Sequence, residues 1–282
     1  MKTVLITGAT SGIGFELFKI FSNEKYKVIG IGRNEKRIKK TLNSINKNSK
    51  NLQGFYLCNF ENLEDIKKVF NKISKEVNSI DILINNAGGI FVNNKLTNNN
   101  IERTFQVNYL SHFLLTDILL KNKILKSKAH VLNVSSIVHK RGEINLDDIN
   151  NLQNYNAIKS YAQSKLSQIM WGYYLSEKHK EIYVNSVHPG IIGTRLLSNN
   201  GFISPILIFF HKIYGKNTNY GAKIVFEVLE HVLKNNINGK YFNERNEEKS
   251  SNYSYSKIIQ EKLFQIVKNS LKIIRINFLT TT

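Results

Sequence analysis

The chain has few of the residues that cross-link or interrupt a fold, and this scarcity excludes several classes of protein. Of its 282 residues only one is cysteine, Cys58, and only two are proline. A single cysteine cannot form an internal disulfide, which fits a reducing compartment. No apolar run reaches the roughly 18 residues that a membrane span needs. Met1 to Thr7 leads directly into a glycine-rich turn, without the pattern of a signal peptide. We therefore expect a cytoplasmic protein without a membrane span, and contact with the surface of an intracellular membrane stays open.

Acidic residues are also scarce, since 21 Asp and Glu stand against 40 Lys and Arg, giving a formal net charge of +19. Such an excess attracts nucleic acid, anionic membranes or phosphorylated ligands. The lysines are spread over the whole chain without a groove-reading or stacking motif, so nucleic-acid binding is not expected. The spacing of His139, His188 and His211 matches no metal-ligand motif, and no metal site is expected.

Apolar runs rich in β-branched residues recur between segments of helical periodicity. They lie at residues 3–7, 27–31, 54–57, 81–84, 130–134, 183–187 and 239–242. Runs without alternating polar residues are typical of parallel strands that are buried on both faces. Their alternation with helices predicts an α/β fold, a doubly wound Rossmann domain with a seven-stranded parallel sheet. No linker or repeat divides the chain, so we expect one domain over residues 1–282. It would end with an exposed connection at 244–256 and a helix at about 257–274.

A glycine-rich turn follows the first predicted strand and precedes a helix. It reads Thr7-Gly8-Ala9-Thr10-Ser11-Gly12-Ile13-Gly14. Glycines let the backbone approach a pyrophosphate, whose charge is met by amides at the helix N-terminus. After the second strand, Arg33 stands where an NAD-binding protein places an acid, and its guanidinium suits a 2′-phosphate. Lys36 and Arg37 add positive charge, so the sequence predicts NADP(H). Asn59, after the third strand, is a candidate for hydrogen-bonding the adenine.

A tyrosine and a lysine share one face of a later predicted helix. Tyr161 and Lys165 are four residues apart and so lie one turn from each other. An ammonium about 4 Å from a phenol would lower the phenol pKa by about two to three units, which suits an acid/base at neutral pH. Ser135 and Ser136 follow a strand at its carboxyl end, where ligands of such sheets bind. One serine would hold the substrate oxygen and the other would satisfy backbone groups.

These motifs occur in the order found in the short-chain dehydrogenase/reductase superfamily, which the chain resembles. The motifs are Thr7-Gly8-x-x-x-Gly12-x-Gly14, Asn85-Asn86-Ala87-Gly88, Asn108, Ser136, Tyr161-x-x-x-Lys165 and Pro189-Gly190. The resemblance implies that Ser136 orients the carbonyl and that Tyr161 is the general acid/base. It also implies that Lys165 lowers the Tyr161 pKa and holds the nicotinamide ribose, and that Asn108 retains the water of a proton relay. Cofactor contacts are implied for Gly8, Ser11, Gly12, Ile13, Gly14, Arg33, Asn59, Asn86, Ala87, Gly88, Tyr161, Lys165, Pro189, Gly190, Ile192 and Thr194.

Over about residues 1–275 the sequence is similar to the retinol-dehydrogenase-like branch of that superfamily. The similarity lies in the wide interval from Ser136 to Tyr161, the turn 187–190 and the strand 239–242. The sequence departs from the branch at Asn59, where aspartate is usual, and we expect no membrane-anchoring extension of the kind common there. A homodimer built from helix faces is implied by the resemblance alone.

An apolar segment follows the predicted nicotinamide-binding turn. Leu196 to Tyr214 is rich in Leu, Ile and Phe, and a lid over about residues 196–217 would enclose an apolar pocket. The same segment would also suit a packing helix. The predicted function is therefore NADP(H)-dependent interconversion of a carbonyl and an alcohol on a lipophilic small molecule, such as a retinoid, steroid or long-chain aldehyde or ketone. A non-catalytic NADP(H)-binding regulatory protein is the main alternative, and a basic module that binds nucleic acid or membrane is the third.

Overall fold

Eight strands form one sheet in the computed structural model, which describes residues 1–45, 52–150, 155–192 and 216–273. Across the sheet their order is β3-β2-β1-β4-β5-β6-β7-β8. The strands are β1 Lys2–Thr7, β2 Tyr26–Gly32, β3 Leu52–Leu57, β4 Ile80–Asn85, β5 Leu125–Val134, β6 Tyr183–His188, β7 Tyr241–Asn243 and β8 Asn246–Glu248. Strands β1 to β7 pair in parallel, which confirms the predicted doubly wound sheet. The expected count of seven is short by one, because β8 pairs antiparallel with β7 at the edge. Its three polar residues are too few to carry a strand pattern.

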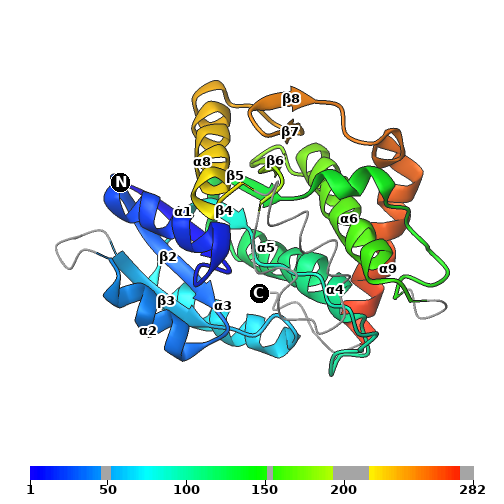
Figure 1. Cartoon of the computed structure of the whole chain (residues 1–282), viewed down its shortest axis with the longest axis horizontal. Helices are drawn as coiled ribbons and strands as arrows, with labels where there is room; N and C mark the ends of the chain where they lie inside the picture. Colours follow the sequence, from blue (N-terminus) through cyan, green and yellow to red (C-terminus); the bar gives the residue numbers. More distant parts are fainter. Residues whose placement is uncertain (46–51, 151–154, 193–215, 274–282) are drawn as a thin grey trace.

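Helices cover both faces of this sheet (Figure 1). They are α1 Gly12–Asn23, α2 Glu35–Asn43, α3 Leu63–Glu76, α4 Arg103–Phe105, α5 Ser111–Lys121, α6 Ala157–Lys178, α8 Thr218–Asn235 and α9 Lys257–Ile273. One apolar cluster joins the sheet to α3, α5, α6 and α9. A second cluster joins the other face to α1 and α8. The apolar strands are therefore buried on both sides, as their sequences predict.

Asparagine, abundant in this sequence, begins several of these helices. Asn34, Asn62, Asn156 and Asn217 are the N-cap residues of α2, α3, α6 and α8, and each side chain accepts hydrogen bonds from backbone N–H groups of the first turn. These bonds satisfy donors that have no partner within the helix. The compositional bias thus has a local structural use.

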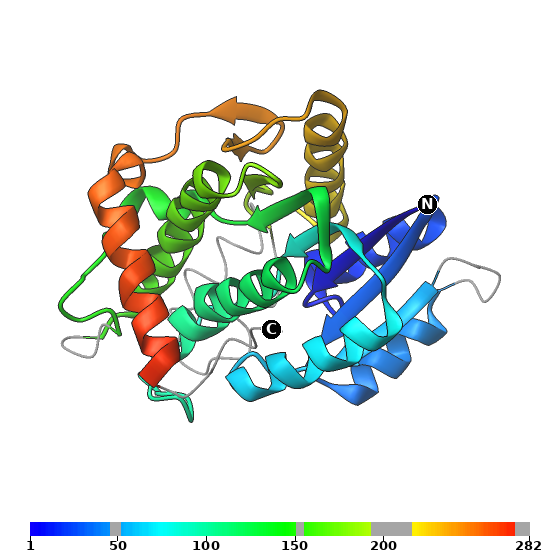
Figure 2. The same ribbon diagram turned by 180° about the vertical axis from the view of Figure 1, so that it is seen from behind.

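The C-terminal part packs more closely than its sequence indicates. Residues 244–256, expected to form an exposed connection, contain β8 and a 3₁₀ turn at Asn252–Tyr255, and they bury Ser250 and Ser254. The Ser250 hydroxyl lies 2.7 Å from the Tyr173 hydroxyl of α6. Helix α9 begins at Lys257, as predicted, and packs along α6, as both Figure 1 and Figure 2 show; within the described residues it reaches Ile273. Within the described residues, no helix has both the length and the apolar character to cross a membrane.

The connections between strands change side between the neighbouring strands β1 and β4. Strand β1 pairs with β2 on one side and with β4 on the other, so the connections leaving the two strands go to opposite halves of the sheet. A crevice is left at the carboxyl ends of strands at such a switch point, where open α/β sheets bind ligands. The residues that follow β1 and β4 are therefore the first place to look for a site.

Candidate active site

The glycine-rich turn after β1 is packed so tightly that larger side chains do not fit. Gly8 and Gly12 have φ of +68° and +58°, in the region that favours glycine. A Cβ added at Gly14 would lie 2.3 Å from the Gly8 carbonyl oxygen and 2.4 Å from Asn86 Nδ2. Ser11, the N-cap of α1, makes no side-chain capping bond, and the first turn of the helix contains no acid. The turn and helix N-terminus therefore fit an anionic group such as a pyrophosphate.

Thr7 joins this turn to the segment after β4. Its hydroxyl oxygen accepts hydrogen bonds of 2.9 Å from the backbone N–H groups of Asn86 and Ala87. In return, Asn86 Nδ2 donates to the Thr7 carbonyl oxygen at 2.8 Å. The preceding residue, Asn85, is fully buried and donates to Asn133 Oδ1 at 2.9 Å. The asparagine pair at the end of β4 thus fixes the two turns and the centre of the sheet relative to each other.

His112, which the sequence analysis did not single out, extends this network. Its Nδ1 lies 2.9 Å from the Asn108 carbonyl oxygen and its Nε2 lies 2.9 Å from the Thr7 hydroxyl. Because a carbonyl oxygen only accepts, Nδ1 carries the proton and Nε2 accepts from Thr7. Burial lowers the pKa of His112 to about 3, so the ring is neutral. Its spacing of four residues from Asn108 on one helix is the sequence signal that could have identified it.

Asn108 lies in a π-helical segment, Gln106–Leu110, between α4 and α5. Its side chain is fully buried and bridges the β4 loop to α6. Oδ1 accepts from the Gly89 N–H at 2.9 Å, while Nδ2 donates to the Gly89 carbonyl and to Ser164 Oγ, both at 3.0 Å. π-helical turns are rare and are often found at functional sites.

The three residues expected to act on substrate lie together beyond the carboxyl end of β5. Ser136 follows that strand, and its side chain is near enough to Tyr161 on α6 to lower the pKa of the phenol. Lys165, one turn further on, is 4% exposed and donates to the Val134 carbonyl oxygen at 2.7 Å. Ser135 Oγ donates to the Lys165 carbonyl oxygen at 3.2 Å. Both serines thus satisfy backbone groups, since Ser136 Oγ accepts from the Val138 N–H at 3.3 Å, and Ser136 is the one that also acts on Tyr161.

Burial has a larger effect on the pKa values of Tyr161 and Lys165 than their charges have on each other. It raises the pKa of Tyr161 to about 12, against a smaller lowering by the Ser136 side chain, and it lowers the pKa of Lys165 to about 7. The expectation that Lys165 would lower the Tyr161 pKa is therefore wrong for this structure. The physical reason is distance and orientation, because Lys165 Nζ lies 5.9 Å from the Tyr161 ring centroid and points to the Val134 carbonyl. At neutral pH the phenol is protonated and is a hydrogen-bond donor.

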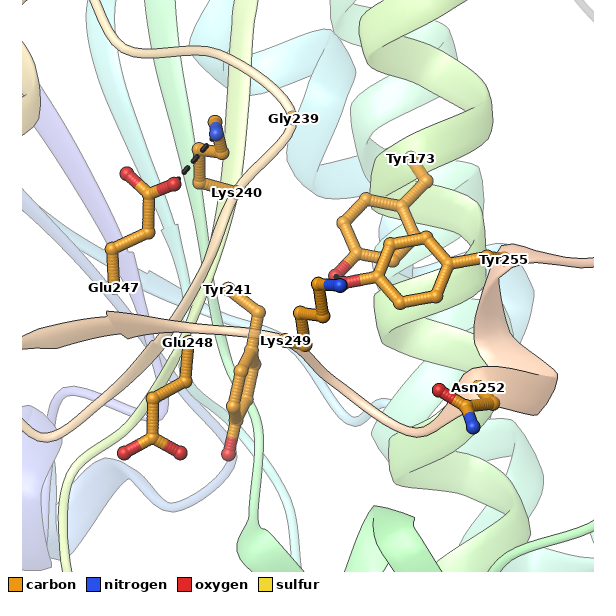
Figure 3. Close-up of a pocket in the computed structure, with 9 residues that line it drawn as sticks. All are labelled: Tyr173, Gly239, Lys240, Tyr241, Glu247, Glu248, Lys249, Asn252 and Tyr255. Carbon is orange, nitrogen blue, oxygen red and sulfur yellow. Dashed lines mark hydrogen bonds and ion pairs between the residues drawn. The ribbon is translucent and has the colours of Figure 1, made fainter.

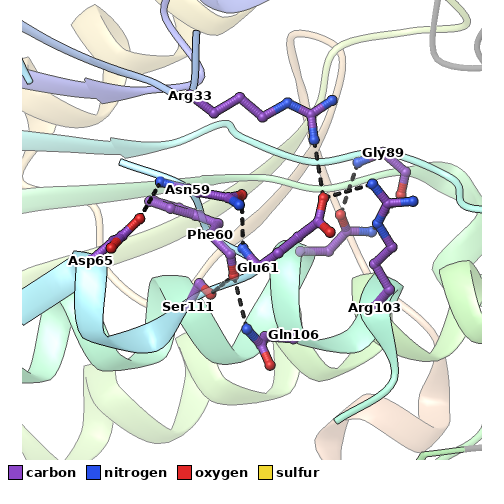
Figure 4. A network of polar contacts seen from close by, with 10 residues as sticks. Arg33, Asn59, Phe60, Glu61, Asp65, Gly89, Arg103, Gln106 and Ser111 are labelled. Carbon is purple, nitrogen blue, oxygen red and sulfur yellow. Dashed lines mark hydrogen bonds and ion pairs between the residues drawn. The ribbon is translucent and has the colours of Figure 1, made fainter. Parts of the chain in front are cut away.

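At the other end of the crevice, Arg33 and Asn59 lie beside each other after β2 and β3. The Cys58 N–H donates to the Gly32 carbonyl at 2.9 Å, which aligns the two strand ends. Asn59 Oδ1 accepts from the Glu61 N–H at 3.1 Å, and Arg33 forms an ion pair of 3.2 Å with Glu61 (Figure 4). The Asn59 side-chain oxygen thus holds the loop 59–61 in place by accepting this bond. Glu61 is a further residue of this end that the sequence analysis did not identify.

The turn after β6 carries the remaining predicted contacts. Gly190 has φ of +93°, and a Cβ there would lie 3.0 Å from Glu244 Oε1. Ile192 is buried, and its side chain packs over Gly221 at the start of α8, close to Ile13. Pro189 directly follows β6. Thr194 and residues 196–215 of the predicted lid lie outside the described residues.

A separate pocket of about 550 Å³ lies near β7, β8 and α6 (Figure 3). It is lined by Tyr173, Gly239, Lys240, Tyr241, Glu247, Glu248, Lys249, Asn252 and Tyr255. Lys240 and Glu247 form an ion pair of 2.6 Å at its edge. This set shares no residue with the predicted catalytic or cofactor residues, and among the described residues no group of histidine, cysteine and acidic side chains could hold a metal ion. The crevice at β1, β4 and β5 is therefore the candidate active site.

Comparison with known proteins gives the same family throughout. Residues 2–201 match the family model described as short chain dehydrogenase. Short-chain dehydrogenase TIC 32 B, chloroplastic, from Brassica napus is 33% identical over 93% of this chain and 86% of its own length. Polyprenol dehydrogenase from Homo sapiens is 28% identical over 93% of this chain and 83% of its length. Retinol dehydrogenase 13 from Mus musculus is 30% identical over 86% of this chain and 75% of its length.

Solved structures share the fold at lower sequence identity. An uncharacterized protein from Mycobacterium paratuberculosis superposes with a TM-score of 0.74 at 22% identity, covering 96% of this chain and 94% of that one. A short-chain dehydrogenase/reductase from Caenorhabditis elegans, solved with cofactor, gives a TM-score of 0.68 at 22% identity, covering 86% of this chain and 93% of that one. At these identities the likeness concerns the fold.

Proposed function

The chain belongs to the short-chain dehydrogenase family, in its retinol-dehydrogenase-like branch, and on that premise we propose that it is an NADP(H)-dependent oxidoreductase. The reaction would interconvert a carbonyl and an alcohol on a lipophilic molecule. The observation that carries the proposal is the meeting of Ser136, Tyr161 and Lys165 beside the glycine-lined crevice. These side chains come from two elements, and only the fold brings them together.

A nicotinamide dinucleotide supplies or accepts the hydride when it is bound. The backbone amides between Gly8 and Gly14 would hold its pyrophosphate, because they lie at the N-terminus of α1, where no side chain caps the helix and the first turn has no acid. Arg33 would hold a 2′-phosphate through its guanidinium fork, since its charge stands where an NAD enzyme has an acid. Lys165 would hold the nicotinamide ribose.

Tyr161 would move the proton at the substrate oxygen. With its pKa raised to about 12 by burial, the neutral phenol donates a hydrogen bond to a carbonyl oxygen and passes its proton to it as the alcohol forms. The Ser136 hydroxyl would bind the same oxygen and fix its position relative to the phenol. In the reverse direction the same atoms take the proton from the alcohol.

Asn108 and Lys165 would help to return a proton to Tyr161 after it has protonated the substrate. Lys165 is buried and its pKa is lowered to about 7, so near neutral pH its ammonium exchanges its proton easily. Asn108 holds the β4 loop against α6 through Gly89 and Ser164, which keeps the lysine and the loop in register. A relay from the phenol through Lys165 toward Asn108 would replace the proton that Tyr161 gives up.

A lipophilic substrate is supported by two kinds of observation. Relatives in the comparison are named as dehydrogenases of polyprenol and of retinol, which are long apolar alcohols. In the sequence, apolar residues from Leu196 to Phe210 follow the turn after β6. An apolar segment at this place in the sequence would suit the lining of a pocket for an apolar ligand.

The test is NADPH oxidation with a panel of lipophilic aldehydes and ketones, comparing wild type with Tyr161→Phe at matched cofactor occupancy. We expect turnover to fall by about 100-fold or more, the range for loss of a general acid. Tyr174→Phe removes a hydroxyl from the same helix outside the site and should keep turnover. NADPH binding without turnover of any carbonyl, and without any effect of Tyr161→Phe, would instead indicate a non-catalytic NADP(H)-binding protein.

A further inference from the structure

Two arginines converge on one carboxylate at the edge of the nucleotide end of the crevice (Figure 4). Arg33 Nη1 lies 3.2 Å from Glu61 Oε1, and Arg103 Nη2 lies 2.6 Å from the same oxygen. The three residues come from the end of β2, the loop after β3 and the start of α4. The cluster therefore forms only when these distant segments are brought together.

The loop that carries Glu61 is fixed on both sides. Asn59 Oδ1 accepts from the Glu61 N–H, and the Phe60 carbonyl accepts from Gln106 Nε2 at 3.1 Å and from Ser111 Oγ at 2.8 Å (Figure 4). Gln106 and Ser111 are fully buried. The backbone that carries Glu61 is thus anchored to the protein interior, and its carboxylate pairs with the two arginines.

The two arginines differ in how firmly they are held. The Arg103 side chain is 26% exposed and its guanidinium lies 4.1 Å from the centre of the Phe91 ring. The Arg33 side chain is 51% exposed. The shorter contact and the aromatic stacking make Arg103 the main counter-charge of Glu61. Since two cations share one anion, the cluster keeps one net positive charge, and the exposed Arg33 presents it.

We propose that Arg103 and Glu61 set the preference for a 2′-phosphorylated dinucleotide by controlling how much of the Arg33 charge is available. This inference rests on the proposed function, in which Arg33 receives the 2′-phosphate. Arg103 acts as a positioning residue, because it works through Glu61. Glu61 opposes the phosphate, since its negative charge competes with the phosphate for Arg33.

The proposal predicts whether each of two substitutions weakens or strengthens NADPH binding. Arg103→Met removes the counter-charge but keeps an apolar stem against Phe91, so Glu61 should hold Arg33 more strongly and NADPH should bind more weakly. Glu61→Gln removes the competing charge at nearly constant shape, so NADPH should bind more tightly. NADH, which lacks the phosphate, should change little in either variant. Partly exposed charge pairs of this kind change affinity by about fivefold.

The experiment measures the dissociation constants of NADPH and NADH for wild type, both single variants and the double variant, without any substrate. The ratio of NADH to NADPH dissociation constants should fall about fivefold in Arg103→Met and rise in Glu61→Gln. In the double variant it should stay near that of Glu61→Gln, because Arg103 acts through Glu61. Arg245→Met makes the same change of charge in an exposed pair with Glu227, at 2.7 Å, and should leave the ratio unchanged.

The outcomes separate this inference from the proposed function. A wild type that prefers NADPH, with a ratio unchanged in both single variants, would overturn the role of Arg103 and Glu61 and leave the cofactor assignment intact. An Arg103→Met effect that persists in full in the Glu61→Gln background would also overturn it, since Arg103 would then meet the phosphate directly. A wild type that binds both dinucleotides equally would remove the proposed cofactor preference and this inference with it. If Arg103→Met does not fold, Glu61→Gln alone still tests the proposal, because it must bind NADPH more tightly than wild type.

Discussion

The two ends of the crevice are built on opposite principles. At the nucleotide end, Arg33 is half exposed and its ion pair with Glu61 lies in contact with solvent. At the catalytic end, Tyr161 and Lys165 are buried, and the hydrogen bonds of Lys165 go to a carbonyl and an amide of the protein. Charge is therefore screened at one end and desolvated at the other.

This difference shows which physical property each end can use. An exposed guanidinium recognises a phosphate by charge and geometry without a change in its own protonation. Desolvation moves the pKa values of the two buried groups in opposite senses. The pKa of Lys165 falls to about 7, which allows proton exchange near neutral pH, while the pKa of Tyr161 rises to about 12, which keeps the phenol protonated as a hydrogen-bond donor. Substitutions at the catalytic end should thus change turnover, and those at the nucleotide end should change cofactor affinity.

The largest effect that would test this contrast is expected from Lys165→Met. The substitution removes a buried ammonium and fills the same space with an apolar chain, so folding should be retained while proton transfer is lost. Turnover should fall by about 100-fold or more. The measurement is kcat at saturating NADPH together with the melting temperature. Unchanged kcat in a folded variant would contradict a catalytic use of the buried charge.

The next largest effect concerns the turn that joins the two ends. Gly14→Ala places a methyl group 2.3 Å from the Gly8 carbonyl oxygen and 2.4 Å from Asn86 Nδ2. The turn must open, which should cost about 1–3 kcal/mol in the free energy of unfolding and weaken binding of both dinucleotides. Urea unfolding and dinucleotide titration measure the two effects. Ser11→Ala, which removes no capping bond, is the stability control and should unfold near wild type.

The neutral His112 predicts how stability depends on pH. Its pKa is about 3 in the folded protein and about 6.5 when unfolded, so the unfolded chain binds the extra proton between these values. The free energy of unfolding should therefore fall as pH drops below about 6.5, by up to about 1.4 kcal/mol per pH unit from this residue. Urea unfolding between pH 7 and pH 5 should show a shallower pH dependence for His112→Gln than for wild type. Parallel dependences would show that His112 is not held neutral.

The smallest expected effect is a difference in salt dependence between cofactor binding at one end and turnover at the other. Because the Arg33 charge is exposed, raising the ionic strength from about 0.05 M to about 0.5 M should weaken NADPH binding by a few fold more than NADH binding. The kcat at saturating NADPH should stay nearly constant, since the charges at the catalytic end are buried. Equal salt dependence for the two dinucleotides would place the 2′-phosphate away from Arg33.

Strong local patterns made much of the fold predictable. The apolar runs fixed strands β1 to β6 to within a few residues at each end, except for the longer β5, because strands buried on both faces tolerate few polar residues. The short β8 and the buried Ser250 were missed, since their structure depends on contacts with β7 and α6. The spacing from Tyr161 to Lys165 correctly predicted one helix. It did not predict where the ammonium points.

The sequence by itself determined the family, the order of the elements and the residue types available to the site, because each depends on local spacing and chemistry. Tertiary structure alone decided three further properties. It placed His112 between Thr7 and Asn108, it brought Glu61 and Arg103 to Arg33, and it moved the Tyr161 pKa upward. Burial and contacts between residues far apart in the chain set all three, and only the local contact of His112 with Asn108 follows from spacing along the chain.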